Sequence, residues 1–253
     1  KHIFKANAEI IEDLTNNRRL LYQDSIIHSY PHCWRCKKPV IFRATEQWFI
    51  AMDTAQLRQQ ALEEIKKVRW LPAWGEERIY NMIANRPDWC ISRQRDWGVP
   101  IPVFYCQECH TPLLSIEAVE MTQKQFRDHG SESWYTRDIS HFIPAGTKCA
   151  KCNHEHFEKG MDILDVWFES GSSFNVIENS PGHRFPADMY LEGGDQYRGW
   201  FHSSLLVGTG LKGGSPYRAC ALNGWVLDGE GRAMHKSLGN TIEPEEIIKH
   251  HGA

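Results

Sequence analysis

The stretch "YLEGGDQYRGWFHSSL", residues 190–205, decides the fold because its hydrophobic pattern changes at a pair of glycines. Before the glycines, "ADMYLEGGD" (187–195) predicts a short apolar strand that ends in a polar turn. After them, "QYRGWFHSSLLVGTGL" (196–211) predicts a helix. Strands that alternate with helices indicate an α/β sheet, and open sheets of this kind bind ligands at the carboxyl ends of their strands. We therefore expect an α/β fold with polar ligand-binding residues at this turn.

The rest of the chain carries further predicted strands and helices. Strands are expected within residues 162–172 and 218–229, and a shorter one at residues 40–42. Amphipathic helices are expected at residues 6–21, 54–69, 76–88 and 242–252, the last with Pro244 near its start and Gly252 after its end. The turn-rich residues 99–160 hold two cysteine pairs, so we expect a small inserted module there.

Composition excludes several classes of protein. The 253 residues include 29 basic and 32 acidic side chains, and the net charge of −3 gives no overall attraction to nucleic acid or to a membrane surface. No apolar run approaches the roughly 18 residues of a membrane span, and the N-terminal residues lack the pattern of a signal peptide. Because the chain opens without an initiator Met and within a helical pattern, we expect an internal fragment of a longer chain. The lack of a secretion signal, together with the cysteine pattern below, predicts a cytoplasmic protein.

Cysteine spacing indicates metal binding in a reducing compartment. Six of the eight cysteines form three Cys-x-x-Cys pairs, which are Cys33/Cys36, Cys106/Cys109 and Cys149/Cys152. Cys90 and Cys220 stand alone among apolar neighbours, where a free cysteine behaves as a small core residue. Paired thiols in a chain without a secretion signal are typical of metal ligands rather than disulfides.

Two of these pairs predict one structural zinc site. A Cys-x-x-Cys turn presents two thiolates, and two such turns complete the four-ligand tetrahedron that Zn²⁺ prefers, so we expect a zinc ribbon at Cys106, Cys109, Cys149 and Cys152. The alternatives are ordinary reduced cysteines, or a histidine (His110, His154 or His156) in place of one thiol. Cys33 and Cys36 lack a second pair, and either hold a second metal ion with ligands from elsewhere or hold none.

A family resemblance rests on four motifs in a fixed order. They are "RPDWCISRQRDWGVPIPVFYC" (86–106), "DVWFESGSS" (165–173), "YLEGGDQYRGWFHSSL" (190–205) and "LDGEGRAMHKSLGN" (227–240). Together they resemble the second half of a class I aminoacyl-tRNA synthetase. Within that class, "PHCWRCKKPVIFRATEQWF" (31–49) and "RDWGVPIP" (95–102) are more similar to bacterial isoleucyl-tRNA synthetases. The resemblance covers essentially the whole chain.

The resemblance implies a fold, a reaction and partners. The fold is the second half of a Rossmann-type catalytic domain with the core of its connective insertion: residues 1–75 leave the editing domain, residues 76–160 form the insertion core with the zinc ribbon, and residues 161–253 complete the nucleotide-binding half. The reaction joins L-isoleucine to ATP, with Mg²⁺, and passes the acyl group to tRNA(Ile). The resemblance further implies a monomer, and a fragment that is inactive alone because the first half is missing.

The loop "GRAMHKSLGN" (231–240) corresponds to the family's KMSKS loop. Lys236 and Ser237 match its last two residues, and a lysine on a mobile loop can stabilise the charge that develops as pyrophosphate leaves. Ala233 replaces the first lysine and His235 replaces the serine, so we expect slower or more pH-dependent activation. The alternative is a change in a flexible loop with no effect on catalysis.

The resemblance also assigns residues to the adenylate and to tRNA. The adenylate contacts it implies come from Glu192, Gly193, Asp195 and Gln196, with Trp200 and Trp167 as pocket walls, and from Lys236. Relatives often carry Ser where Gly194 stands, and either tryptophan is equally compatible with a core position. Arg93 and Arg95 are expected to position tRNA, with structural salt bridges as the competing interpretation.

Two rival functions stay open at this point. Valyl or leucyl specificity is the runner-up within the enzyme class, because the other wall of the amino-acid pocket lies in the missing half. A hydrophobic pocket separates isoleucine from valine by only about one methylene, roughly 1–3 kcal/mol. A noncatalytic zinc-ribbon protein that binds nucleic acid is the rival from another class. The net charge of −3 and the lack of clustered basic residues disfavour it.

Overall fold

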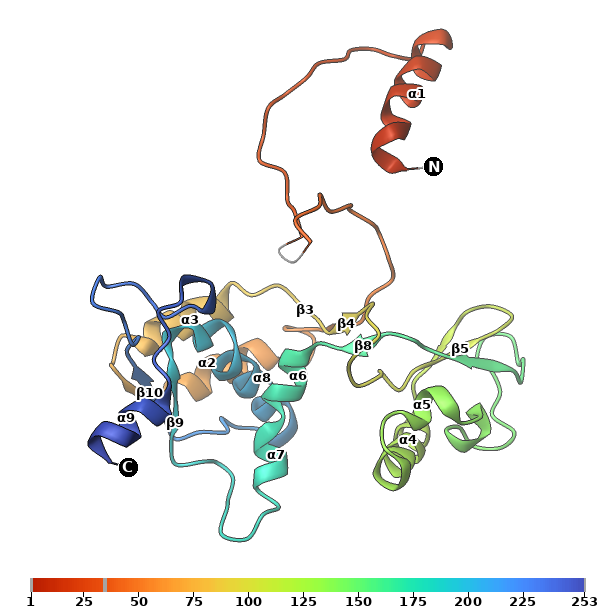
Figure 1. The fold of residues 1–253 in the computed structure, drawn as a ribbon. Coiled ribbons are helices and arrows are strands. Elements are labelled where there is room, and N and C mark those ends of the chain that lie inside the picture. The colour runs from red at the N-terminus through yellow and green to blue at the C-terminus, as the bar shows by residue number, and fades with distance from the viewer. Residues whose placement is uncertain (1, 34–35, 253) are drawn as a thin grey trace. The chain divides into compact units, whose positions relative to one another are not determined.

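The computed structural model describes residues 2–33 and 36–252 (Figure 1). The chain divides into two compact units, residues 1–46 and residues 47–253, which we describe separately. No helix among the described residues has both the length and the apolar character needed to cross a membrane.

The described residues of the first unit contain one helix, α1 (Ile3–Asn16). The helix ends earlier than predicted because Asn17 turns the chain and Arg18 adopts a left-handed conformation with φ 53°. The strand expected at residues 40–42 does not form; in its place, a single bridge joins His32 to Pro39.

A three-stranded parallel sheet organises the second unit. Its strands are β2 (Arg69–Leu71), β10 (Ala219–Asn223) and β9 (Tyr190–Gly193), in the order β2-β10-β9. Helices α2 (Leu57–Ile65), α3 (Gly75–Ala84) and α8 (Trp200–Lys212) accompany it (Figure 1). Their buried side chains form one apolar core with those of the strands, and it includes Trp70, Tyr197, Phe201, Tyr217 and Cys220. The α/β class and the predicted strand–turn–helix order are therefore confirmed.

The turn after β9 continues as a short 3₁₀ helix, η2 (Gly194–Arg198), before α8 begins. Helix α8 runs between apolar layers, because every residue from Phe201 to Thr209 is buried. It ends at Gly213, whose left-handed conformation (φ 72°) suits a residue without a Cβ.

The prediction of a strand at residues 162–172 is largely wrong. Only β8 (Ile163–Leu164) is extended, and the helices α6 (Val166–Gly171) and α7 (Ser173–Ile177) follow it. The cause is Asp165, whose carboxylate accepts a hydrogen bond from the backbone N–H of Trp167 at 3.2 Å and so caps α6. Similarly, the strand expected within residues 218–229 stops at Asn223.

The inserted module has its own sheet and core. Strands β6 (Pro112–Leu113), β5 (Phe104–Cys106) and β7 (Phe157–Lys159) pair antiparallel. Phe104 of β5 forms the core of the module together with Trp134 and Phe142. Its helices are α4 (Ile116–His129), α5 (Ser133–Thr136) and the 3₁₀ turn η1 (Ile139–His141). Sequence analysis missed α4, although Ser115 caps its start and Gly130 follows its end.

Short elements complete the second unit. Strand β1 (Phe49–Ile50) pairs with β3 (Trp89–Cys90), and β4 (Ser92–Arg93) pairs with β8, both antiparallel. Near the C-terminus, η3 (Lys236–Leu238) precedes α9 (Pro244–His251).

Candidate functional site

The turn between β9 and α8 presents polar groups at the carboxyl end of the sheet. Glu192 and Gly193 are the last residues of β9, and the carboxylates of Glu192 and Asp195 are exposed. The Gln196 side chain accepts a hydrogen bond from the backbone N–H of Trp200 at 2.9 Å and donates one to Asp195 Oδ2 at 3.1 Å. Gln196 therefore fixes the first turn of α8 and orients a neighbouring carboxylate.

The two predicted tryptophans lie in different surroundings. The ring of Trp200 stacks on Tyr190 with centroids 3.9 Å apart, and its indole N–H donates to Ser170 O and Ser173 Oγ, both at 3.0 Å. Trp167 is 41% exposed, and its ring covers Gly199: a Cβ there would lie 2.7 Å from the ring. The structure therefore brings Trp167 to the turn and packs Trp200 against α6 and α7.

Two further side chains reach the same turn. A Cβ built on Gly193 would contact the ring of Trp225 at 3.8 Å, and one built on Gly194 would lie 4.0 Å from Arg78 Nη1. Arg78 is held by the ring of Tyr197, 5.0 Å from its guanidinium carbon. Sequence reasoning missed both residues, because Arg78 comes from α3 and Trp225 from beyond β10. In the structure, the parallel pairing of Asn223 with Gly193 brings the segment that carries Trp225 to this turn, which no spacing in the sequence indicates.

The loop that carries Lys236 is braced at its base by Asp228. The Asp228 carboxylate accepts hydrogen bonds from the backbone N–H groups of Glu230 (3.0 Å) and Arg232 (2.9 Å), from Arg232 Nε (2.9 Å) and from Asn240 Nδ2 (2.8 Å). These bonds, that of Asn240 first, lower the pKa of Asp228 to about 2. The brace is therefore charged throughout the neutral range.

Asn240 connects this brace to the tip of the loop. Its Oδ1 accepts a hydrogen bond from the backbone N–H of His235 at 2.8 Å. His235 Nδ1 in turn lies 2.7 Å from Ser237 Oγ and accepts from the Ser237 backbone N–H at 3.3 Å, so His235 caps η3. Lys236 follows directly and is exposed, which leaves its ammonium available to a ligand.

Four cysteines of the inserted module form a group that can hold a metal ion. The sulfur atoms of Cys106, Cys109, Cys149 and Cys152 all lie within 4.8 Å of one another. The Cys106–Cys152 and Cys109–Cys149 distances are 3.5 Å. Four sulfurs at about 2.3 Å from one ion would stand slightly under 4 Å apart, roughly the spacing observed.

The two Cys-x-x-Cys segments, Cys106/Cys109 and Cys149/Cys152, form the same kind of backbone turn. The backbone N–H of His110 bonds the carbonyl of Cys106, and that of Asn153 bonds the carbonyl of Cys149, both at 2.9 Å. His110 and Asn153 adopt left-handed conformations, with φ 53° and 60°. Hydrogen bonds with Thr111 lower the pKa of Cys109 to about 6, whereas burial and the neighbouring thiols raise the pKa of Cys152 to about 12, because the four groups titrate as one set.

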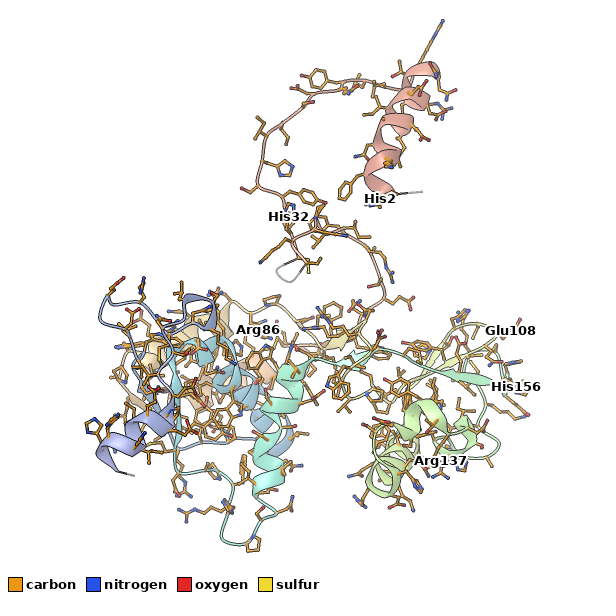
Figure 2. The ribbon with its side chains drawn as sticks, viewed as in Figure 1. His2, His32, Arg86, Glu108, Arg137 and His156 are labelled. Carbon is orange, nitrogen blue, oxygen red and sulfur yellow. The ribbon has the colours of Figure 1, made fainter. Side chains whose placement is uncertain are left out.

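The candidate histidines lie outside this group of four sulfurs. His110 Nδ1 is 3.8 Å from Glu158 Oε1. The rings of His154 and His156 pack edge to face, with centroids 5.2 Å apart. Figure 2 labels His156 and Glu108 in this part of the module.

The third cysteine pair has a similar backbone turn. Lys37 has φ 60°, and its backbone N–H bonds the carbonyl of Cys33 at 2.8 Å. Residues 34 and 35, inside this pair, lie outside the described residues. Among the described residues, the group of side chains that could hold a metal ion consists of the four cysteines of the module. Cys33 and Cys36 are not part of that group.

The two arginines predicted to contact tRNA differ in their partners. Arg93 pairs with Asp165 at 2.8 Å and donates to the carbonyls of Cys90 and Ser92. Asp165 also accepts from the indole of Trp89 at 3.0 Å, so Arg93 belongs to a structural network. Arg95 is exposed and lines a hollow together with Trp97 and Glu169.

The family follows from a comparison with known proteins. The model of the class I tRNA synthetases (I, L, M and V) matches residues 6–253, so the chain belongs to that family. It is 55% identical over 252 residues to the isoleucine–tRNA ligase of Geobacter sulfurreducens, 54% over 255 residues to that of Nitratidesulfovibrio vulgaris and 51% over 252 residues to that of Moorella thermoacetica. Each match covers 99% of this chain and 27% of the relative, so the chain spans about a quarter of their length.

One solved structure is similar at a lower level. The chain matches the LeuRS–tRNA–LeuAMS ternary complex of Agrobacterium radiobacter K84 with a TM-score of 0.45 and 24% identity, over 65% of this chain and 23% of the other.

Proposed function

We propose that this chain is part of an isoleucine–tRNA ligase that activates L-isoleucine with ATP and Mg²⁺ and transfers it to tRNA(Ile). The observation that carries the proposal is the β9–η2–α8 unit beside β10, which gathers carboxylates, glycines and an amide at the carboxyl end of a parallel sheet. Family membership and relatives named isoleucine–tRNA ligase support the amino acid. The 253 residues alone are then one portion of the catalytic machinery.

We assign the architecture accordingly. The parallel order β2-β10-β9 supports half of a Rossmann-type sheet, with residues 161–253 as its second half. Residues 76–160 then carry the insertion core and residues 1–75 the exit from an editing domain, except that α2, β2 and α3 pack with β9, β10 and α8 in one core and so belong to the catalytic sheet. The division into residues 1–46 and 47–253 allows the N-terminal helix to belong to that separate domain.

The adenylate occupies the turn after β9 in this proposal. The carboxylates of Glu192 and Asp195 suit the substrate ammonium group and ribose hydroxyls. Gly193 lets the backbone approach the ligand, and Gln196 holds Asp195 in place. Trp167 forms one wall of the site, whereas Trp200 supports it from the core.

Lys236 stabilises the leaving pyrophosphate. Its exposed ammonium at the start of η3 sits on a loop that Asp228 and Asn240 brace. A preorganised cation at this point lowers the barrier because it meets charge that develops only in the transition state. His235 and Ser237 act together as the cap that orients Lys236. Ala233 contributes no charge, so activation relies on a single lysine of the loop.

Zinc is the metal we assign to the four cysteines. Soft thiolates in two tight turns suit tetrahedral Zn²⁺, and four protein ligands leave no open position for chemistry. The ion would therefore stabilise the module, because it would connect the end of β5 to the turn before β7.

Of the two arginines expected to contact tRNA, Arg95 is the exposed one and suits that role, whereas Arg93 has a structural role.

Charging of tRNA(Ile) with labelled isoleucine by the full-length protein tests this function. The proposal expects charging that depends on ATP and falls by about 100-fold in Lys236→Ala, since one transition-state contact contributes roughly 3 kcal/mol. Lys249→Ala, which removes a lysine from α9, is the matched control and should charge normally. Charging of tRNA(Val) or tRNA(Leu) in place of tRNA(Ile) would overturn the assignment.

A further inference from the structure

A polar pocket lies between the end of α3 and the start of α8, and the last residue of η2, Arg198, also lines it. Its volume is about 540 Å³, and its polar lining consists of Asn81, Asn85, Arg86, Arg198 and His202. Figure 2 labels Arg86, at the point where the chain leaves α3. All lining residues belong to the described part of the chain. They include two arginines and no carboxylate, so the pocket favours an anion.

Two buried polar atoms of this pocket have no hydrogen-bond partner within the described residues. They are Arg86 Nε and His202 Nε2. His202 is only 6% exposed, and yet its ring lines the pocket. Buried polar groups in native proteins are almost always hydrogen-bonded, so this pocket offers one unused donor and one unused ring nitrogen that a ligand with matching groups would satisfy.

The guanidinium of Arg86 is positioned by an aromatic ring and has no carboxylate paired with it among the described residues. The guanidinium of Arg86 stands over the ring of Trp89, 5.3 Å from its centroid. The carboxylate that acts on it electrostatically is Asp165, which already pairs with Arg93 at 2.8 Å and with the indole of Trp89. Burial lowers the pKa of Arg86, but guanidinium remains charged at neutral pH.

The histidine offers an acceptor to the ligand. Burial first, and then the charge of Arg86, lower the pKa of His202 to about 4, so its ring is neutral at pH 7. The ring hydrogen-bonds the backbone carbonyl of Tyr197, and because Nε2 has no partner the donor is Nδ1–H. In this tautomer Nε2 carries a lone pair. A ligand that fits this pocket therefore carries a hydroxyl donor next to a negatively charged group.

We propose that this pocket binds a ribose-phosphate unit of single-stranded RNA, with the phosphate on Arg86 and Arg198 and the 2′-hydroxyl donating to His202 Nε2. A ribose-phosphate places the required anion and hydroxyl on adjacent atoms, and the 2′-hydroxyl is the group that distinguishes RNA from DNA. The choice of RNA rests on the proposed function, in which tRNA is a substrate. The two asparagines add donors and acceptors that suit sugar and base edges.

The test compares short fluorescent single-stranded RNA with DNA of the same sequence, each titrated with the full-length protein at fixed salt. The proposal expects RNA to bind more tightly than DNA. His202→Phe should reduce RNA binding by about tenfold, to the level of DNA, and leave DNA binding unchanged, because it removes one hydrogen bond and no charge. Arg86→Ala should weaken both ligands and reduce the salt dependence of binding.

Arg127→Ala is the matched control, since it removes the same charge from the exposed face of α4. If His202→Phe does not fold, Arg86→Lys, which keeps the charge but lacks Nε, should still weaken RNA binding. Equal affinity for RNA and DNA in the unaltered protein would overturn the proposal. So would displacement of the RNA by an equimolar amount of inorganic phosphate, because the ligand would then be free phosphate. If the protein charges tRNA(Ile) but fails these binding tests, only the proposal for this pocket is wrong. If it charges no tRNA, the proposed function is wrong.

Discussion

Asp228 and Asn240 are joined by a hydrogen bond of 2.8 Å between Oδ2 and Nδ2, across the base of the loop that carries Lys236. Asn240 also accepts a hydrogen bond from the His235 backbone, so one carboxylate and one amide fix both sides of the loop. A flexible glycine-rich segment is thereby given a defined tip. The position of the lysine depends on these two side chains as much as on its own.

Asp228→Asn should therefore slow activation. The substitution removes the charge that four hydrogen bonds share, and charge-assisted bonds are roughly twice as strong as neutral ones. We expect kcat for ATP–pyrophosphate exchange by the full-length protein to fall about tenfold, with the KM for isoleucine nearly unchanged. Glu230→Gln removes a carboxylate from the same loop but none of these bonds, and it should leave kcat intact. An equal loss in both variants would show that only the charge of the loop matters.

The four-cysteine site should determine the stability of the inserted module. Cys106→Ser should abolish binding of one zinc ion per chain, measured by metal analysis, because a hydroxyl is a poor replacement for a thiolate ligand. Without the ion, the module around Trp134 should become sensitive to protease. Cys90→Ser changes a cysteine outside the group and should retain the metal. Full zinc content in Cys106→Ser would contradict the assignment.

Gly199 should tolerate no larger residue. A Cβ there would lie 2.5 Å from Gln196 Oε1 and 2.7 Å from the ring of Trp167. Gly199→Ala should therefore displace both side chains and cost about 1–3 kcal/mol of the free energy of unfolding. Gly210→Ala, inside the helix that Gly199 precedes, meets only Leu57 at 3.8 Å and should be neutral or slightly stabilising. Denaturant unfolding measures both, and equal stability of the two variants would contradict the predicted clash.

His202 should make the second unit less stable in mild acid. Its folded pKa of about 4 lies below the unfolded value of about 6.5, so the unfolded chain binds more protons between these limits. The free energy of unfolding should fall as the pH drops from about 6.5 to about 4, by up to roughly 3 kcal/mol from this residue. His202→Asn should flatten this part of the curve in chemical unfolding measured across that range. A curve of unchanged slope would mean that the ring is charged in the folded state.

Local signals in the sequence predicted the parts of the fold that depend on neighbours in the chain. The strand at Tyr190–Gly193, the helix after it and the two cysteine turns all follow from short motifs. The strand predicted at residues 162–172 was wrong because an apolar run of that length suits either state, and the cap formed by Asp165 decided for a helix.

The remaining site residues depend on contacts between distant segments. Arg78 reaches the β9 turn from α3, and Arg86 meets His202 across more than a hundred residues of sequence. No spacing rule connects such pairs, because packing of the helices against the sheet brings them together. The same holds for Arg93, whose structural role depends on Asp165 and was only one of two alternatives in the sequence.

The central claim is that this chain belongs to an enzyme that activates isoleucine. The most direct measurement is amino-acid-dependent ATP–pyrophosphate exchange by the full-length, zinc-loaded protein, across isoleucine, valine, leucine and methionine. We predict that isoleucine supports exchange far better than leucine and methionine. The kcat/KM for valine should be about 10- to 200-fold lower than that for isoleucine, which is the discrimination that one methylene allows. Exchange driven best by another of these amino acids, or by none of them while the protein is folded, would contradict the account.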